Sequence, residues 1–124
     1  MATIALTKEI FEQTITGNDL VIVDFWAPWC GPCKAFAPIF EKASEEIADV
    51  VFAKVDTDSQ KELAETFQIR SIPTLMIFRQ SIIIFSQPGM LPEQALAEVI
   101  EKAKALDMDQ VRAEIEKEKN KQEQ

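Results

Sequence analysis

Apolar residues along the chain follow two spacings, one typical of strands and one typical of helices. Residues 20–26 (Leu-Val-Ile-Val-Asp-Phe-Trp) form a nearly unbroken run of β-branched and aromatic side chains, as expected of a strand buried on both faces of a sheet. Residues 50–55 predict a second strand. Residues 74–78 and 82–85 predict two more, and the gap between these is short enough for a hairpin.

Between these strands, apolar residues recur with helical spacing. Helices are predicted to begin at Thr7, at about Cys33, at Asp58 or Ser59, and at Pro92. The second of them, residues 33–48, contains Pro38, which must cost it one backbone hydrogen bond and bend its axis. A helix between two strands implies a crossover and a parallel pair, whereas the hairpin adds antiparallel strands. The pattern therefore predicts an α/β fold, a mixed sheet covered by helices on both faces.

The length and composition fit one globular domain and exclude several classes of function. The chain has 124 residues, of which 47% are apolar, and it is too short for two ordinary domains. The absence of histidine excludes Ser-His-Asp and Cys-His catalysis, zinc sites that use histidine, and histidine-ligated haem. The net charge of −8 argues against binding to nucleic acid or to anionic membranes. Chemistry is left to the two cysteines, the carboxylates, lysine and arginine.

The ends of the chain bear on its location. The N-terminus does not resemble a signal peptide, because its apolar stretch is short and Glu9 stands where that stretch would have to continue. No segment approaches the roughly 18 apolar residues of a membrane span. We therefore expect a cytoplasmic protein in a reducing compartment, where a cysteine pair is more often catalytic or metal-binding than structural.

The two cysteines lie in the segment Trp29-Cys30-Gly31-Pro32-Cys33, directly after the central strand and at the start of the next helix. Cysteines at positions i and i+3 of the first helical turn share one face, so a disulfide can join them. Unpaired N–H groups and the macrodipole at the helix N-terminus favour the thiolate of Cys30. A disulfide that closes so small a loop adds only about 2 kcal/mol of stability, so a structural role explains the pair poorly.

Metal binding is the other use of such a pair. A mononuclear zinc site needs four ligands, and two thiols without histidine do not supply them. A metal or iron–sulfur cluster shared between two chains would have four thiolates and stays open as an alternative. Thiol–disulfide exchange is the use that the position of the pair favours.

The residues around the cysteines resemble those of the thioredoxin family. The run from Asp24 to Lys34 (Asp-Phe-Trp-Ala-Pro-Trp-Cys-Gly-Pro-Cys-Lys) is similar to that family's active-site signature. The similarity continues in order through Pro38, residues 54–56, residues 70–74 and Gly89, and so covers residues 1–106. It implies the thioredoxin fold, with about five strands and about four helices. Residues 107–124 would form an added, charged helical extension.

The cysteines are expected to have different roles. Cys30, at the helix N-terminus, is assigned as the attacking thiolate, and Cys33, deeper in the helix and less exposed, as the resolving thiol. Because Gly31 and Pro32 place no charge between the sulfurs, the couple is expected to act as a reductant. No cofactor beyond this dithiol is expected.

Asp24 is an unusual residue for a buried strand, where desolvation should raise its pKa. The family places the matching aspartate beneath the second cysteine, so the resemblance implies that Asp24 is the general base for Cys33. It also implies that Lys54 lies near this carboxyl group and lowers its pKa. The alternatives are a solvent-facing carboxylate at position 24 and an exposed strand lysine at position 54.

Pro73 follows Ile72 at a point where the resemblance implies a cis peptide bond opposite the cysteines. The backbone of Ile72 would then be free to pair with an extended segment of a substrate. An ordinary trans proline in a loop is the alternative. The apolar docking surface around the sulfurs would consist of Trp29, Gly31, Pro32, Ile72, Pro73 and Gly89.

Two segments depart from the family pattern. Arg79-Gln80-Ser81 stands where the hairpin turn commonly holds an Asn-Gly type pair, so a longer turn or another turn type is expected. The following strand, residues 82–86, is apolar on both faces and would promote aggregation if it were an exposed edge. Something should therefore cover it. The apolar stripe of the extension could pack there or form a homodimer, a solvated helix being the alternative; the stripe is Leu106, Met108, Val111 and Ile115.

We expect a general protein-disulfide reductase that acts on disulfide-containing client proteins, most simply as a monomer. The resemblance implies that its electrons come from thioredoxin reductase, a flavoprotein that uses NADPH. Two other functions stay open, a binding or holdase module and a maturation factor for a single client. The intact motif together with Asp24 and Pro73 favours the reductase, because a pure scaffold has no need of all three.

Overall fold

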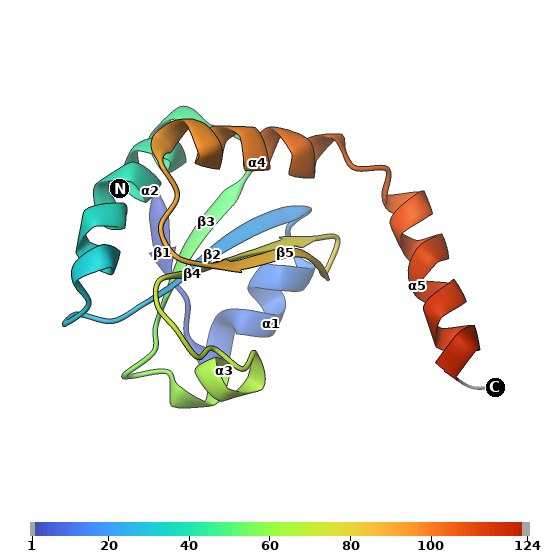
Figure 1. Cartoon of the computed structure of the whole chain (residues 1–124), viewed down its shortest axis with the longest axis horizontal. Coiled ribbons are helices and arrows are strands. Elements are labelled where there is room, and N and C mark those ends of the chain that lie inside the picture. The colour runs from blue at the N-terminus through green and yellow to red at the C-terminus, as the bar shows by residue number, and fades with distance from the viewer. Residues whose placement is uncertain (1, 123–124) are drawn as a thin grey trace.

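A five-stranded mixed sheet forms the centre of the molecule (Figure 1), in a computed structural model that describes residues 2–122. The strand order is β1-β3-β2-β4-β5. β3 pairs in parallel with β1 and β2, whereas β4 pairs antiparallel with β2 and β5. The predicted mixed sheet is thus confirmed. The strands are β1 (Thr3–Ala5), β2 (Leu20–Trp26), β3 (Val51–Asp56), β4 (Thr74–Arg79) and β5 (Ile82–Pro88).

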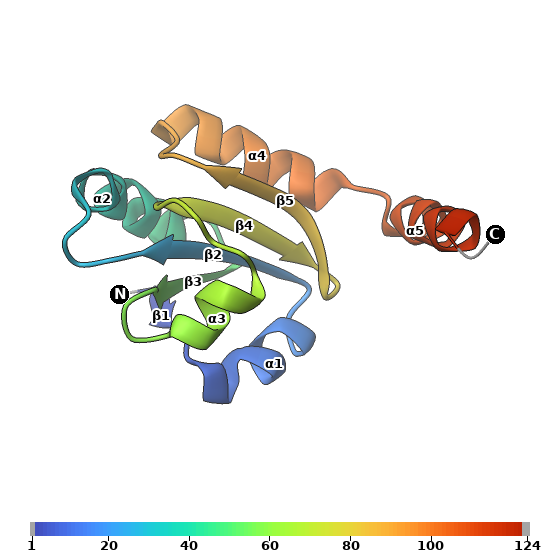
Figure 2. The same ribbon diagram turned by 60° about the horizontal axis from the view of Figure 1, so that its bottom comes forward.

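Helices cover both faces of the sheet, as Figures 1 and 2 show together. On one face lie α2 (Gly31–Glu46) and α4 (Glu93–Ala105), and on the other α1 (Lys8–Thr16) and α3 (Lys61–Thr66). The additional helix, α5 (Met108–Gln122), projects beyond the end of the sheet. No helix within residues 2–122 is long and apolar enough to cross a membrane.

The alternation of side chains along β2 determines which face Asp24 occupies. Successive residues of a strand point to opposite faces of a sheet. Leu20 and Ile22 belong to the buried cluster beneath α2 and α4, whereas Val21 and Val23 belong to the cluster on the α1 and α3 side. Asp24 has the same parity as Leu20 and Ile22. Its carboxylate therefore points to the face that α2 covers.

Two predicted helix starts differ from the structure by two residues or more, whereas Thr7 and Pro92 are the N-cap residues directly before α1 and α4. The helix predicted from Cys33 begins at Gly31 and runs through Pro38 without interruption. The helix predicted from Asp58 or Ser59 begins only at Lys61. The reason is that the Asp56 carboxylate accepts the backbone N–H groups of Asp58 and Ser59, at 2.9 and 3.4 Å, and holds these residues in a turn before the helix.

One strand was not predicted, and one turn was predicted wrongly. β1 has only 3 residues, too few to show a strand periodicity. In the β4–β5 hairpin, Arg79 pairs with Ile82, which leaves a two-residue turn rather than a longer one. Gln80 and Ser81 have φ values of 51° and 67°, the positive values that a type I′ turn requires at both positions. The Gln80 N–H donates to the Asp19 carbonyl at 2.7 Å, which helps to hold this backbone.

Candidate active site

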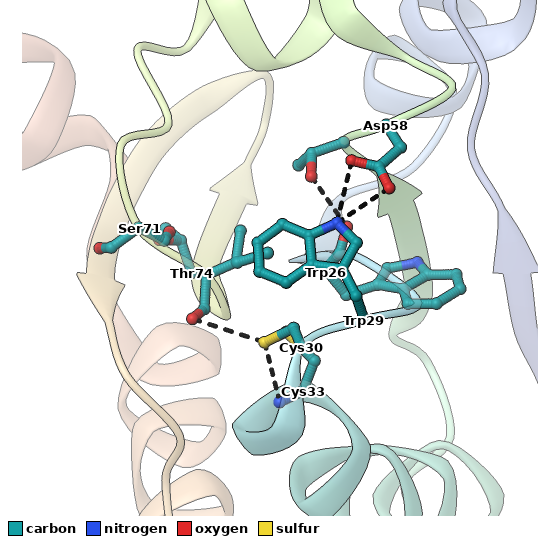
Figure 3. The surroundings of a disulfide bond; sticks show 9 residues. Trp26, Trp29, Cys30, Cys33, Asp58, Ser71 and Thr74 are labelled. Carbon is teal, nitrogen blue, oxygen red and sulfur yellow. Dashed lines mark hydrogen bonds between the residues drawn. A yellow bond between two sulfur atoms is a disulfide. The ribbon is translucent and has the colours of Figure 1, made fainter.

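Cys30 and Cys33 occupy the first turn of α2, directly after β2 and its short connecting loop. They form a disulfide, with Cα atoms 5.2 Å apart. Cys30 is the N-cap residue of α2, and the backbone N–H of Cys33 points at the Cys30 sulfur from 3.2 Å, as Figure 3 shows. When the disulfide is reduced, this N–H and the helix N-terminus favour negative charge on the Cys30 sulfur.

The side chains of both cysteines are buried. Cys30 is 4% exposed and Cys33 is 3% exposed, so exposure does not separate their roles as expected. Both pack with Ala27, Trp26 and Ile72. The difference between the two cysteines lies in their helix positions, because Cys30 precedes the first helical residue and Cys33 follows it.

The loop before β4 brings a backbone edge to the disulfide. The Ile72–Pro73 peptide bond is cis, as the resemblance implied. The Ile72 carbonyl oxygen lies 3.7 Å from the Cys30 sulfur. The Pro73 carbonyl accepts the Gly89 N–H at 2.8 Å, and the Thr74 hydroxyl donates to the Ser71 carbonyl at 2.6 Å. These bonds fix residues 71–74 and Gly89 together beside the cysteines.

Trp29 is the most exposed large apolar residue of this region. Its side chain is 69% exposed. Its indole Nε1–H donates to both carboxylate oxygens of Asp58, at 3.0 and 3.3 Å (Figure 3). Asp58 was missed as a site residue, because the two positions are 29 residues apart and no local pattern connects them. Gly31 and Pro32 are exposed on the neighbouring turn, and Met90 is exposed next to Gly89.

Asp24 is a buried carboxyl group in β2, on the face of the sheet that α2 covers. It is 1% exposed, and neither of its oxygens has a hydrogen-bond partner within residues 2–122. Burial raises the pKa of Asp24 to about 7, and the positive charge of Lys54 acts in the opposite direction. A carboxyl group with such a pKa is present in both protonation states near neutral pH. It can therefore accept a proton and return it.

Lys54 faces the same side of the sheet as Asp24. The two residues are paired in register between β3 and β2. The Lys54 ammonium lies 4.8 Å from the centroid of the Trp26 ring, in a cation–π contact, while Asp24 has no polar partner in the described part of the chain. Lys54 thus influences the carboxylate through its field and not through a direct ion pair.

The predicted site residues therefore come from four parts of the chain that the fold brings to one end of the sheet. They are the end of β2 with the first turn of α2, the middle of β3, the loop before β4 and the loop after β5. Among the residues that the structure describes, no group of three or more metal-ligating side chains lies close enough to hold a metal ion. The arrangement can exchange a disulfide at the start of α2, and the same face of the sheet carries a buried carboxyl group, Asp24, whose pKa is about 7.

Comparison with known proteins agrees with this geometry. The family model Thioredoxin matches residues 2–102. A Streptomyces coelicolor protein named "Putative thioredoxin 2" is 58% identical over 114 residues, which is 92% of this chain and 85% of that protein. That alignment necessarily extends past residue 106. Thioredoxin of Bacillus subtilis is 37% identical over 103 residues, 82% of this chain and 98% of its own length.

Solved structures give the same result. A mutant thioredoxin from Halobacterium salinarum has a TM-score of 0.77 at 31% identity, and the match covers 85% of this chain and 93% of that one. Spinach chloroplast thioredoxin F has a TM-score of 0.77 at 33% identity, with 84% and 95% covered. Sequence, fold and cysteine geometry agree, and the chain belongs to the thioredoxin family.

Proposed function

We propose that this thiol–disulfide oxidoreductase works as a general reductant of protein disulfides. The observation that carries the proposal is the position of the Cys30–Cys33 couple, with Cys30 as the N-cap of α2 and the Cys33 N–H aimed at its sulfur. This geometry stabilises a thiolate on Cys30. With no charged residue between the cysteines to stabilise it further, the dithiol form gives up its electrons readily.

In the first step, the Cys30 thiolate attacks one sulfur of a substrate disulfide. A bond forms between Cys30 and that sulfur, the substrate S–S bond breaks, and the other substrate sulfur leaves as a thiolate that takes up a proton. The product is a mixed disulfide between the two proteins. Burial of Cys30 at 4% exposure means that the substrate disulfide must come to the surface formed by the surrounding loops.

In the second step, Asp24 accepts the proton of the Cys33 thiol. The Cys33 thiolate attacks the Cys30 sulfur, which breaks the mixed disulfide and releases the second substrate sulfur as a thiolate. The substrate gains two electrons, and the protein is left with the Cys30–Cys33 disulfide. Because the pKa of Asp24 is about 7, the carboxyl group can then pass its proton on. Lys54 keeps this pKa from rising further, since its charge lowers it.

Substrates would dock on the apolar surface around the disulfide. The exposed Trp29 indole, oriented by Asp58, forms one side of this surface, and the cis-proline loop forms the other. The backbone of Ile72 lies beside Cys30 and can pair with an extended substrate segment. Backbone pairing and contact with a flat apolar surface select little for particular substrate side chains, which suits a reductant with many client proteins.

The cycle requires a donor that reduces the Cys30–Cys33 disulfide again. Thioredoxin reductase, the flavoprotein that uses NADPH, is the donor that membership of this family favours, and a reducing cytoplasm is the setting in which the cycle would operate. Thioredoxins themselves need no cofactor, so the dithiol is sufficient for the exchange proposed for this chain.

Reduction of insulin disulfides by dithiothreitol tests this function. The wild-type protein is expected to accelerate the reaction, and Cys30→Ser and Cys33→Ser are each expected to return the rate to the level of dithiothreitol alone. Circular dichroism spectra that match the wild type would show that the variants are folded. A wild-type rate equal to that of the two variants would contradict the proposal.

A further inference from the structure

We propose that the groove between β5 and α5 binds a second copy of this chain, each copy inserting its α5 into the groove of the other. The proposal concerns a surface separate from the one proposed for disulfide exchange, and treats residues 107–124 as an extension with its own role. The groove is lined from β5 by Ile82, Ile83 and Ile84, and from α5 by Val111, Glu114 and Ile115.

Exposed apolar side chains gather at this groove. Ile83 is 46% exposed, Leu106 38% and Ile115 40%, and Leu106 and Ile115 also line the groove. Among residues 2–122, the other large exposed apolar residues are Trp29 beside Cys30, Met90 after Gly89, and Ile4 on β1. β5 is the last strand in the sheet order, so its outer edge has no neighbouring strand within residues 2–122. An apolar groove beside an open strand edge is a site for association.

α5 has little support from its own molecule. Met108 is its one buried residue among those described, and the helix stands apart from the sheet in both Figure 1 and Figure 2. Beyond its first turn, the polar link to the body is the Arg112 guanidinium, which donates to Gln80 in the hairpin turn. A helix of 15 residues is marginally stable alone in water. Packing against a partner would stabilise it.

The charges on α5 favour a second copy in the antiparallel direction. Asp107 and Glu114 line the groove near the start of the helix. A spacing of seven residues places Lys117 and Lys121 on the same face further along, together with Glu118. The first half of this face is therefore acidic and the second half has an excess of positive charge. Two antiparallel copies bring opposite charges and opposite helix dipoles together.

The place of the groove in the molecule also favours a second copy over a client. The N-terminus of α2, which carries the cysteines, lies at one end of the sheet, and α5, which lines the groove, lies beyond the other end (Figures 1 and 2). β5 runs from the groove at Ile83 to the edge of the site at Gly89, a path of about 20 Å at the rise of a strand. A client protein that is bound in the groove would therefore not have its disulfide positioned at Cys30. A two-fold dimer built there leaves both reactive ends free.

Sedimentation velocity over a wide range of protein concentrations tests the proposal. In 0.15 M salt, where the Debye length is about 8 Å, the net charge of −8 is largely screened. The wild type is expected to reach twice its 14.0 kDa chain mass as concentration rises. Ile83→Lys and Ile115→Glu are each expected to weaken dimerisation by at least about ten-fold. Ile4→Lys, which changes an equally exposed isoleucine at the opposite edge of the sheet, is the matched control and should dimerise as the wild type does.

Charge exchange tests the antiparallel arrangement. Glu114→Lys and the double variant Lys117→Glu/Lys121→Glu should each dimerise less than the wild type, and a mixture of the two should form the heterodimer. Circular dichroism and insulin reduction at wild-type rates would show that each variant is folded and that the dimer is separate from the exchange site. A wild type that stays monomeric at every concentration, or a mixture that does not associate, would overturn the proposal.

Discussion

The two ends of the central sheet are built differently. At the end that carries the disulfide, loops are fixed by short backbone hydrogen bonds, such as that from Gly89 to Pro73 at 2.8 Å. The Asp24 carboxyl group is buried there without a polar partner among residues 2–122. At the opposite end, a largely buried charged side chain has several polar partners. The Arg79 guanidinium donates to the carbonyls of Ala103, Lys104 and Leu106 and to the Asp19 carboxylate. What is exposed at this end is the apolar surface of the groove between β5 and α5.

The difference shows what each end is suited to. A buried carboxylate without a partner costs stability, and such a group is expected where a proton must be moved. An exposed apolar groove costs solubility, and such a groove is expected where another surface binds. The reactive end is thus specialised in its chemistry, and the far end in its contacts. Substitutions at four positions, the first with a companion variant at Lys54, test this contrast in order of expected effect.

Replacement of the buried carboxylate should have the largest effect. The pKa of Asp24 rises from 3.8 in the unfolded chain to about 7 in the fold, so the folded state holds this proton more tightly. Stability therefore falls as pH rises through that window, by up to about 4 kcal/mol above it. Asp24→Asn removes this cost and should raise the unfolding free energy at pH 8, but not at pH 3.5.

The same variant should slow the release of the mixed disulfide by about a hundred-fold, because in the proposed mechanism Cys33 loses its proton acceptor. Chemical denaturation at the two pH values and stopped-flow measurement of the release step check both effects. Equal stability of Asp24→Asn and wild type at pH 8 would show that the carboxylate is not destabilising.

Lys54→Met is the companion variant of Asp24→Asn. It should raise the pKa of Asp24 further, because it removes the positive charge that lowers this pKa.

At the other end, Arg79 should matter for stability and not for exchange. Its side chain is 15% exposed, and its bonds to the three carbonyls are 2.7, 3.1 and 3.2 Å long. Arg79→Met keeps the apolar stem but leaves the part-buried Ala103 carbonyl without its donor and exposes the other two to water, at a cost of about 2 kcal/mol. Urea denaturation measures the loss. Insulin reduction below the temperature of unfolding should stay at the wild-type rate, and a parallel fall in this rate would contradict the separation of the two ends.

The bond from Trp29 to Asp58 should have a smaller effect, confined to the reactive end. Asp58→Ala frees the indole, which should lower kcat/KM for a protein disulfide by about five-fold, the equivalent of 1 kcal/mol. Asp58→Asn keeps an acceptor oxygen and is the matched control. Steady-state kinetics and tryptophan fluorescence report on the two variants. Equal loss in both would assign the effect to the charge of Asp58 instead of the hydrogen bond.

The smallest effect is expected in the hairpin turn. Ser81 has a φ of 67°, a conformation that glycine adopts with less strain. Ser81→Gly should therefore stabilise the protein by about 0.5 kcal/mol, with no change in exchange activity. Thermal unfolding followed by circular dichroism is sufficient to detect it. Destabilisation would mean that the serine side chain makes a contribution to the turn that outweighs the strain.

The sequence predicted best the segments with a long apolar run or with a characteristic motif. β2 was predicted over its whole length, because a nearly unbroken run of β-branched and aromatic residues is typical of a strand that is buried on both faces. The disulfide pair and its place at the start of a helix followed from the spacing of two cysteines after that strand. The cis bond before Pro73 followed from the family resemblance, not from the residue itself.

Contacts between distant segments could not be predicted in this way. The Trp29–Asp58 hydrogen bond and the bonds of Arg79 join parts of the chain that only the folded sheet brings together. The hairpin turn was predicted wrongly because its residues are poor formers of a type I′ turn, and pairing of the long flanking strands imposes the backbone instead. The separation of the two ends is likewise a property of the fold.

The most direct test of the reactive end is the mass of the complex with a disulfide substrate. Cys33→Ser keeps the proposed attacking thiolate but lacks the proposed resolving thiol, so incubation with insulin should yield a covalent adduct that mass spectrometry assigns to Cys30. Cys30→Ser should yield none, and the wild type should yield reduced insulin with the Cys30–Cys33 disulfide. Adduct formation through Cys33 in Cys30→Ser, at the rate seen for Cys33→Ser, would contradict the assignment of the two cysteines.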